Sequence, residues 1–299
     1  MFDISIGTLI PVEHATEMIP QLNTQNFECY TLDFNRCKPA EMDLQAWAQK
    51  ILPLLEGRKI SCLGFYKNPI MNPEEREHLA ALIRGAKWFG CDTLGAFAGG
   101  NPEKTIPDTI PQFKEVWEPL AKLAEENGVR IGFEGCGGGW KGGSHNIAYC
   151  PDAWELMFDA VPSQALGLEW EPCHALAQQS DPIMQLRHWA HRVVHIHGKD
   201  GTIAWDVIRE YGINSPHAYC WNRTPGFGDT NWSDIFTILI QAGFTGACDI
   251  EGFHDPVHYD DMEWTAQVQA LSYLKACRGG QVFWEGPNEY RGYQGNRKK

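Results

Sequence analysis

Eight short apolar segments recur along this chain of 299 residues, and they constrain its fold more than any other feature. Amphipathic segments separate them, so the pattern alternates between buried strands and helices with one apolar face. Eight strand–helix units in about 280 residues match a single-domain α/β fold, the (β/α)8 TIM barrel, which usually has ~250 residues. A doubly wound open sheet is the alternative. The expected strands are Ile4–Ile10, Cys29–Phe34, Ile60–Phe65, Thr93–Ala98, Val129–Glu134, Ala165–Glu171, Val193–His197 and Gly246–Glu251.

The helical segments between these strands have recognisable ends. Pro111–Asn127 carries its apolar side chains on one face and stops at Gly128, which is typical of a helix C-terminus. Pro73 opens another helix, with acidic residues near its positive dipole end. Trp232–Ala242 and Met262–Cys277 are read as helices too. We expect the barrel to span residues 1–278 and residues 279–299 to form a C-terminal extension. That extension would pack on the barrel or on a neighbouring subunit, so a homo-oligomer is possible.

Composition excludes several classes of protein. The formal net charge of −13 argues against a nucleic-acid partner, because such binding depends on a basic surface. No stretch approaches ~18 apolar residues, so no membrane span is expected, and the N-terminus lacks the basic start of a signal peptide. The ten cysteines form no CxxC pair, and several lie in apolar runs. This pattern favours a reducing, cytoplasmic environment.

Residues 166 to 174 (LGLEWEPCH) begin as a buried strand and end in Glu169, Glu171 and His174. An unpaired buried charge costs several kcal/mol, so something must compensate these groups. Active sites of (β/α)8 barrels lie at the C-terminal ends of the strands, which is where these residues fall. A metal ion would compensate them.

The other late strands also end in carboxylates or histidines. Side chains alternate along a strand, so Glu169 and Glu171 share a face, as do the pairs His195/His197 and Asp249/Glu251; in each pair the later residue lies closer to the rim. Three carboxylates and one imidazole favour Mn²⁺, with Mg²⁺, Co²⁺ or Zn²⁺ as alternatives. A salt-bridge network at the barrel mouth is the competing interpretation. The predicted ligands of one divalent metal ion are Glu134, Glu171, His197 and Glu251.

These motifs resemble the xylose isomerase-like TIM-barrel superfamily of sugar isomerases and epimerases, which includes the tagatose/psicose 3-epimerases, inosose dehydratase and endonuclease IV. The family's Asp-Pro-Ser-His is similar to residues 171–174 (EPCH), and its His-x-His-x-Lys-Asp is similar to residues 195–200. The strand-five glutamate aligns with Glu134 and the strand-eight Ile-Glu with residues 250–251. Residues 221–232 resemble the Arg…Pro-Gly-x-Gly loop. Glu171 departs from the family aspartate by one methylene.

The resemblance implies the same four metal ligands, with Glu134 and Glu251 also serving as the catalytic acid/base pair. It implies His174 and Arg223 as substrate-binding residues. The implied activity is a metal-dependent isomerase or epimerase acting on a keto-sugar or keto-glycoside, a small carbohydrate, through an enediolate. A lyase or dehydratase acting on a keto-inositol or 3-keto-glycoside and a non-catalytic sugar-binding barrel are the alternatives. Endonuclease activity is disfavoured, because strands two to four end without the histidines that its trinuclear site needs.

Several neighbouring residues keep two interpretations. His174 would contact substrate or orient Glu171. Lys199 would act on substrate or pair with Asp200. His145, in a glycine-rich loop, would bind substrate or be exposed, and residues 254–255 would edge the pocket. Glu169 and His195 are expected to support the metal ligands through hydrogen bonds, as metal sites usually require.

Overall fold

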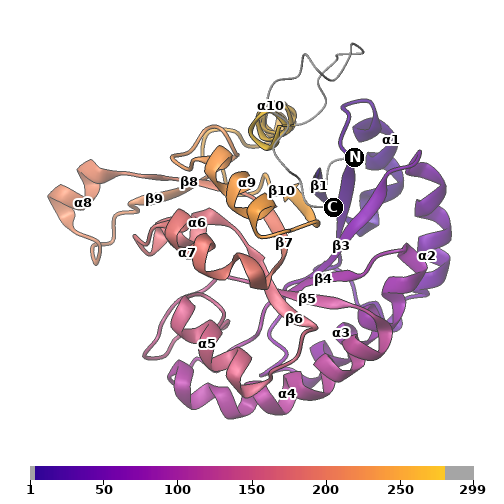
Figure 1. Ribbon diagram of the computed structural model, residues 1–299, viewed down its shortest axis with the longest axis horizontal. Helices are drawn as coiled ribbons and strands as arrows, with labels where there is room; N and C mark the ends of the chain where they lie inside the picture. The colour runs from indigo at the N-terminus through magenta and orange to yellow at the C-terminus, as the bar shows by residue number, and fades with distance from the viewer. Residues whose placement is uncertain (1–3, 280–299) are drawn as a thin grey trace.

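A computed structural model describes residues 4–279 of the chain. Within them eight parallel strands close into a barrel in the order β1-β10-β7-β6-β5-β4-β3-β2, with the helices around it (Figure 1). Because β1 pairs with both β2 and β10, the sheet has no free edge; this confirms the predicted (β/α)8 barrel and rules out the open sheet. The strands are β1 (Ser5–Pro11), β2 (Cys29–Asp33), β3 (Lys59–Phe65), β4 (Thr93–Ala96), β5 (Arg130–Glu134), β6 (Leu166–Trp170), β7 (Val193–Gly198) and β10 (Ala247–Ile250).

The helices follow the strands along the chain and cover the outside of the barrel (Figure 1). Pro73 begins α3 and Gly128, with a left-handed φ of 66°, ends α4, as their positions in the sequence predict. The predicted extension, apart from Gly279, lies outside the described residues. The helices are α1 (Ala15–Asn23), α2 (Leu44–Ile51), α3 (Pro73–Gly85), α4 (Ile106–Asn127), α5 (Pro151–Ala160), α6 (Pro172–Ala177), α7 (Pro182–Trp189), α8 (Trp205–Tyr211), α9 (Trp232–Gln241) and α10 (Asp261–Arg278).

The start of α4 differs from the prediction. The helix begins at Ile106, and Pro111 lies inside it. Thr105 explains the earlier start, because its hydroxyl accepts a hydrogen bond from the Asp108 backbone N–H (3.2 Å) and donates one to the Asp108 carboxylate (2.6 Å). This reciprocal cap sets the helix boundary five residues before the proline that the sequence suggested.

A two-stranded antiparallel sheet, β8 (Asp200–Ile203) and β9 (Cys220–Arg223), follows β7 and projects from the barrel together with α8 (Figure 1). The sequence does not indicate these strands, because neither contains an apolar run. Their role in the fold is to carry the chain out from the end of β7 and back to the rim at Arg223.

The apolar core lies largely between the strands and the surrounding helices, where the rings of Trp117 and Phe133 meet edge to face at 4.6 Å. The barrel interior instead holds buried polar side chains from several strands. Between residues 4 and 279, none of the helices is both long enough and apolar enough to cross a membrane. The buried polar side chains that contact one another inside the barrel include Thr31, Ser61, Glu169, His195, His197 and Asp249.

Candidate active site

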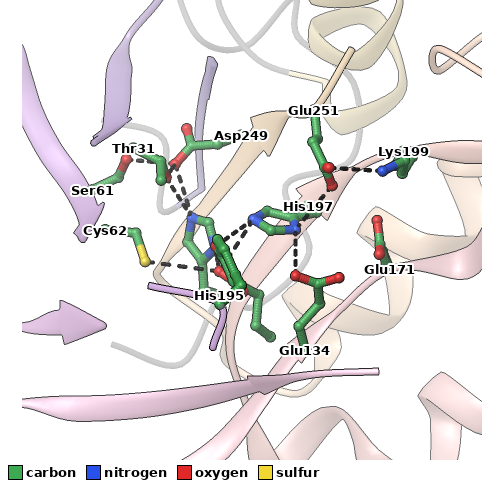
Figure 2. Close-up of polar contacts among 12 residues, drawn as sticks. Thr31, Ser61, Cys62, Glu134, Glu171, His195, His197, Lys199, Asp249 and Glu251 are labelled. Atoms are coloured by element: carbon green, nitrogen blue, oxygen red, sulfur yellow. Dashed lines mark hydrogen bonds and ion pairs between the residues drawn. The ribbon is translucent and has the colours of Figure 1, made fainter. Parts of the chain in front are cut away.

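The four predicted metal ligands come together at the C-terminal end of the barrel. β5, β6, β7 and β10 are consecutive in the closed sheet, and each delivers one of them. Glu171 directly follows β6 and is still extended, with φ −148° and ψ 146°, so the alternation of side chains carries through to it. Ligand atoms of Glu134, Glu171 and His197 lie within 4.8 Å of one another. Glu251 Oε2 lies 3.3 Å from His197 Nδ1, on the opposite side from Glu134 (Figure 2).

Unsatisfied buried atoms indicate that this cluster fits a cation. Both carboxylate oxygens of Glu171, Nδ1 of His197 and Oε2 of Glu251 are buried and make no aligned hydrogen bond among the described residues. Buried polar atoms are normally hydrogen-bonded, so these atoms retain unused acceptor capacity. Carboxylates with one imidazole form a donor set suited to a divalent ion such as Mg²⁺ or Mn²⁺. Ion pairs reach Glu171 Oε1 from His174 and Glu251 Oε2 from His197, but they leave Glu171 Oε2 without a partner among the described residues.

The pKa shifts of Glu134 and Glu251 also indicate a site suited to a cation. Burial raises the pKa of Glu134 to about 7 against the hydrogen bond from His174, and the nearby charges of Glu171 and Glu251 also raise it. Burial would raise the pKa of Glu251 as well, but Lys199 and His197 outweigh it and hold this pKa below its usual range. A bound cation would relieve the crowding of these carboxylates, since opposite charge favours the ionised form.

His174 and Lys199 also reach the cluster. The ammonium group of Lys199 lies 2.7 Å from Glu251 Oε1, so Lys199 pairs with Glu251 rather than with Asp200. Asp200 instead accepts hydrogen bonds from the indole of Trp232 (2.9 Å) and from backbone N–H groups. His174 Nε2 lies against Glu171 and 3.4 Å from Glu134 Oε1, which matches the orienting alternative. Substrate contacts by His174 and Lys199 stay predictions.

The structure does not bring Arg223 and His145 into the cluster. Arg223, at the end of β9, donates from Nε to Asp255 Oδ2 at 3.3 Å. His145 is exposed in the loop that follows β5. Within residues 4–279 neither side chain has a polar contact with the four proposed ligands, so their roles in substrate binding also stay predictions.

Beneath the cluster, Glu169 and His195 lie where the strand alternation placed them. Glu169 Oε1 is 2.7 Å from His195 Nδ1 and 3.3 Å from His197 Nε2. The structure adds two residues to which the sequence analysis gave no role: Tyr66, whose hydroxyl is 3.0 Å from His197 Nε2, and Asp249, 2.8 Å from His195 Nε2. Their signals were present in the sequence, because Tyr66 follows β3 and Asp249 shares a face with Glu251.

Residues 26–277 match the model of the xylose isomerase-like TIM barrel family. The chain belongs to this family. It is 23% identical over 192 residues to an inosose dehydratase of Clostridium tetani, covering 59% of this chain and 60% of that relative. The chain therefore spans less than two thirds of that relative's length.

Solved structures share the fold of this xylose isomerase-like barrel at low sequence identity. The E. coli 3-keto-D-glucoside 4-epimerase YcjR superposes with a TM-score of 0.69 and 12% identity, covering 92% of this chain and all of that one. A Mycobacterium smegmatis protein of the same fold, solved in complex with magnesium, gives a TM-score of 0.69 and 15% identity, with 92% and 98% coverage. Sugar epimerases and dehydratases are thus both among the proteins that this chain resembles.

Proposed function

We propose that this protein is a divalent-metal-dependent isomerase or epimerase acting on a keto-sugar or keto-glycoside, with Mn²⁺ as the metal. One observation carries the proposal: Glu134 Oε2 (3.9 Å) and Glu251 Oε2 (3.3 Å) lie on two sides of His197 Nδ1, in a cluster whose buried acceptor atoms lack hydrogen bonds. The 3-keto-glucoside epimerase and the magnesium complex among the proteins of the same fold support this assignment.

Glu134, Glu171, His197 and Glu251 would hold the metal. A divalent ion bound there would act as a Lewis acid on the carbonyl and adjacent hydroxyl oxygens of a ketose. Of the two glutamates that flank His197, one removes the proton from the carbon beside the carbonyl and the other returns a proton to the opposite face. Such a transfer inverts that carbon, which is epimerisation.

Four basic side chains would bind the substrate oxygens. Lys199 and His174 already contact the cluster and carry N–H donors that a hydroxylated substrate can accept. Arg223 and His145 would contact the more distant part of the substrate. This set of donors fits a polyhydroxylated molecule.

A lyase or dehydratase is the second candidate, and the curated relatives named inosose dehydratase favour it. The same proton removal is followed by departure of a hydroxyl group from the neighbouring carbon, so the net loss is one molecule of water. The residues required are the same. The two candidates therefore differ in the fate of the substrate.

Turnover in deuterium oxide tests both candidates. The Mn²⁺-loaded protein is incubated with ketoses, 3-keto-glucosides and keto-inositols, and products are followed by NMR and mass spectrometry. Epimerisation predicts one solvent deuteron at an inverted carbon with the mass otherwise retained. Dehydration predicts loss of water. A panel without any turnover would argue against both and favour a sugar-binding barrel.

Glu134→Gln and Glu251→Gln test the roles of the two glutamates. Each keeps the shape of the side chain and removes its capacity to transfer a proton, so we expect kcat to fall about 10²-fold or more. Glu118→Gln, on the exposed face of α4, is the matched control and should retain full activity. Full turnover in both active-site variants would refute the catalytic assignment.

A further inference from the structure

The layer directly beneath the proposed ligands contains three buried ionisable side chains in a row. Glu169 of β6, His195 of β7 and Asp249 of β10 are each at most 1% exposed. Glu169 Oε1 lies 2.7 Å from His195 Nδ1, and Asp249 Oδ2 lies 2.8 Å from His195 Nε2 (Figure 2). Barrel interiors are usually filled by branched apolar side chains, so an ionic layer here requires an explanation.

Glycines in two other strands leave the space that the two carboxylates occupy. A Cβ atom added at Gly95 in β4 would overlap the carboxylate of Glu169, and one added at Gly7 in β1 would overlap that of Asp249. Asp249 is also tied to two further strands, because the hydroxyls of Thr31 (2.6 Å) and Ser61 (2.5 Å) donate to its Oδ2. Both carboxylates are therefore held in single positions.

The hydrogen bonds define which atoms carry protons. A carboxylate only accepts hydrogen bonds, so both ring nitrogens of His195 donate, one to each neighbour. Glu169 Oε1 also lies 3.3 Å from Nε2 of His197. The same nitrogen lies 3.0 Å from the hydroxyl of Tyr66, so the His197 ring is held from the barrel interior through Nε2. Nδ1 is the ring nitrogen that faces Glu134 and Glu251.

We infer that Asp249, His195 and Glu169 form a positioning network that fixes the ring orientation of His197, with its Nδ1 presented to the cluster. Asp249 acts through His195, and His195 acts through Glu169. Some carboxylates accept a hydrogen bond from the second ring nitrogen of a metal-binding histidine. Replacing such a carboxylate typically weakens metal binding 10–100-fold. This inference rests on the metal site of the proposed function and adds Asp249 as a positioning residue.

Mn²⁺ binding to the metal-free protein tests the network, with calorimetry on the wild type, Glu169→Gln, Asp249→Asn and the double variant. We expect Glu169→Gln to weaken Mn²⁺ binding about 10–100-fold. Asp249→Asn should weaken it by a smaller factor. The double variant should bind no more weakly than Glu169→Gln, because Asp249 has no route to His197 once Glu169 is changed.

A generic loss of a buried hydrogen bond would not produce this pattern. Tyr30→Phe is the matched control, since the buried Tyr30 hydroxyl donates to Asn23 (2.7 Å) and has no contact with the network within the described residues. It should leave Mn²⁺ affinity unchanged, and circular dichroism should show every variant folded. Wild-type affinity in Glu169→Gln, or fold-changes of the two single variants that multiply in the double, would overturn the inference.

Nitrogen-15 NMR of histidine side chains in the metal-free protein gives a readout that needs neither metal nor turnover. The wild type should show one sharp set of His197 signals, because the ring is held in one orientation, and Glu169→Gln should broaden or double these signals. A wild type that binds no Mn²⁺ would defeat the proposed function, whereas sharp and unchanged His197 signals in Glu169→Gln would defeat only the network.

Discussion

At the scale of single residues, the length of Glu171 is a sharp test of the site. Glu171 is also the N-cap residue of α6, although its side chain makes no capping hydrogen bond. Aspartate would draw the carboxylate back by about 1.5 Å, one carbon–carbon bond, and aspartate is a preferred N-cap. We expect the shorter carboxylate in Glu171→Asp to turn toward the N–H groups in the first turn of α6. Calorimetry should then show Mn²⁺ binding weakened about 10-fold or more.

Two comparisons make this test specific. Glu171→Gln keeps the length and removes the charge, so it should also lose affinity but should leave α6 uncapped. Glu171→Asp should therefore melt at a higher temperature than Glu171→Gln in the absence of metal. If Glu171→Asp bound Mn²⁺ as tightly as the wild type, the extra methylene would have no function, although the family motif carries the shorter residue.

Strand alternation and the positions of the strand ends were enough to predict the side chains that meet in the cluster. Glu171, His197 and Glu251 follow from the rule that alternate residues share a face, and Glu134 is the polar residue that ends its strand. The pair between Lys199 and Glu251 was missed, because it depends on how a long flexible side chain turns at the rim. The role of Asp249 was missed for another reason: its partners Thr31 and Ser61 come from strands far away in the sequence and reach it across the barrel interior.

At the scale of elements, Asp255 joins the loop after β10 to the end of β9. Its carboxylate accepts hydrogen bonds from the backbone N–H groups of Thr224 (2.9 Å), Val257 (2.8 Å) and His258 (3.0 Å), and from Arg223. Burial would raise the pKa of Asp255, but these bonds outweigh it and lower the pKa to about 2. The ionised carboxylate therefore ties together two loops, one of which carries the predicted substrate residue Arg223.

The sign of the pH dependence follows from that lowered pKa. The folded pKa of Asp255 lies below the ordinary value of 3.8, so its stabilisation is present above about pH 4 and is lost as the pH falls toward 2. We expect Asp255→Asn to lower the free energy of unfolding at pH 7 by about 1–3 kcal/mol. Urea unfolding should show this difference between the wild type and Asp255→Asn narrowing as the pH falls from about 4 toward 2. A gap that stayed constant with pH would contradict the ionised role.

The strands of the barrel could be predicted better than β8, β9 and the start of α4. Each of the eight strands falls on a continuous apolar run, because both faces of a barrel strand are covered. β8 and β9 are short, and half of β9 is polar (CWNR), so neither apolar runs nor alternation revealed them. The predicted start of α4 at Pro111 was five residues too late, because the cap that Thr105 forms with Asp108 was not recognised.

At the scale of the whole molecule, metal binding and folding should be coupled. The fold gathers Glu134, Glu171 and Glu251 at one end of the barrel, where they contact the basic side chains of Lys199, His174 and His197. An ion that binds only the folded chain at 100 times its Kd adds about 2.7 kcal/mol to the free energy of unfolding. For a chain of this length we expect chelation to lower the melting temperature by roughly 4 °C, measured by calorimetry with EDTA and then with Mn²⁺ restored.

The double variant Glu134→Gln/Glu171→Gln separates the site from any other metal-binding surface. It removes two of the proposed ligands and also part of the carboxylate repulsion, so its metal-free form should melt at or above the temperature of the metal-free wild type. Added Mn²⁺ should then leave its melting temperature unchanged. A shift as large as that of the wild type would mean that the stabilising ion binds elsewhere, and the unsatisfied atoms of Glu171, His197 and Glu251 would need another partner.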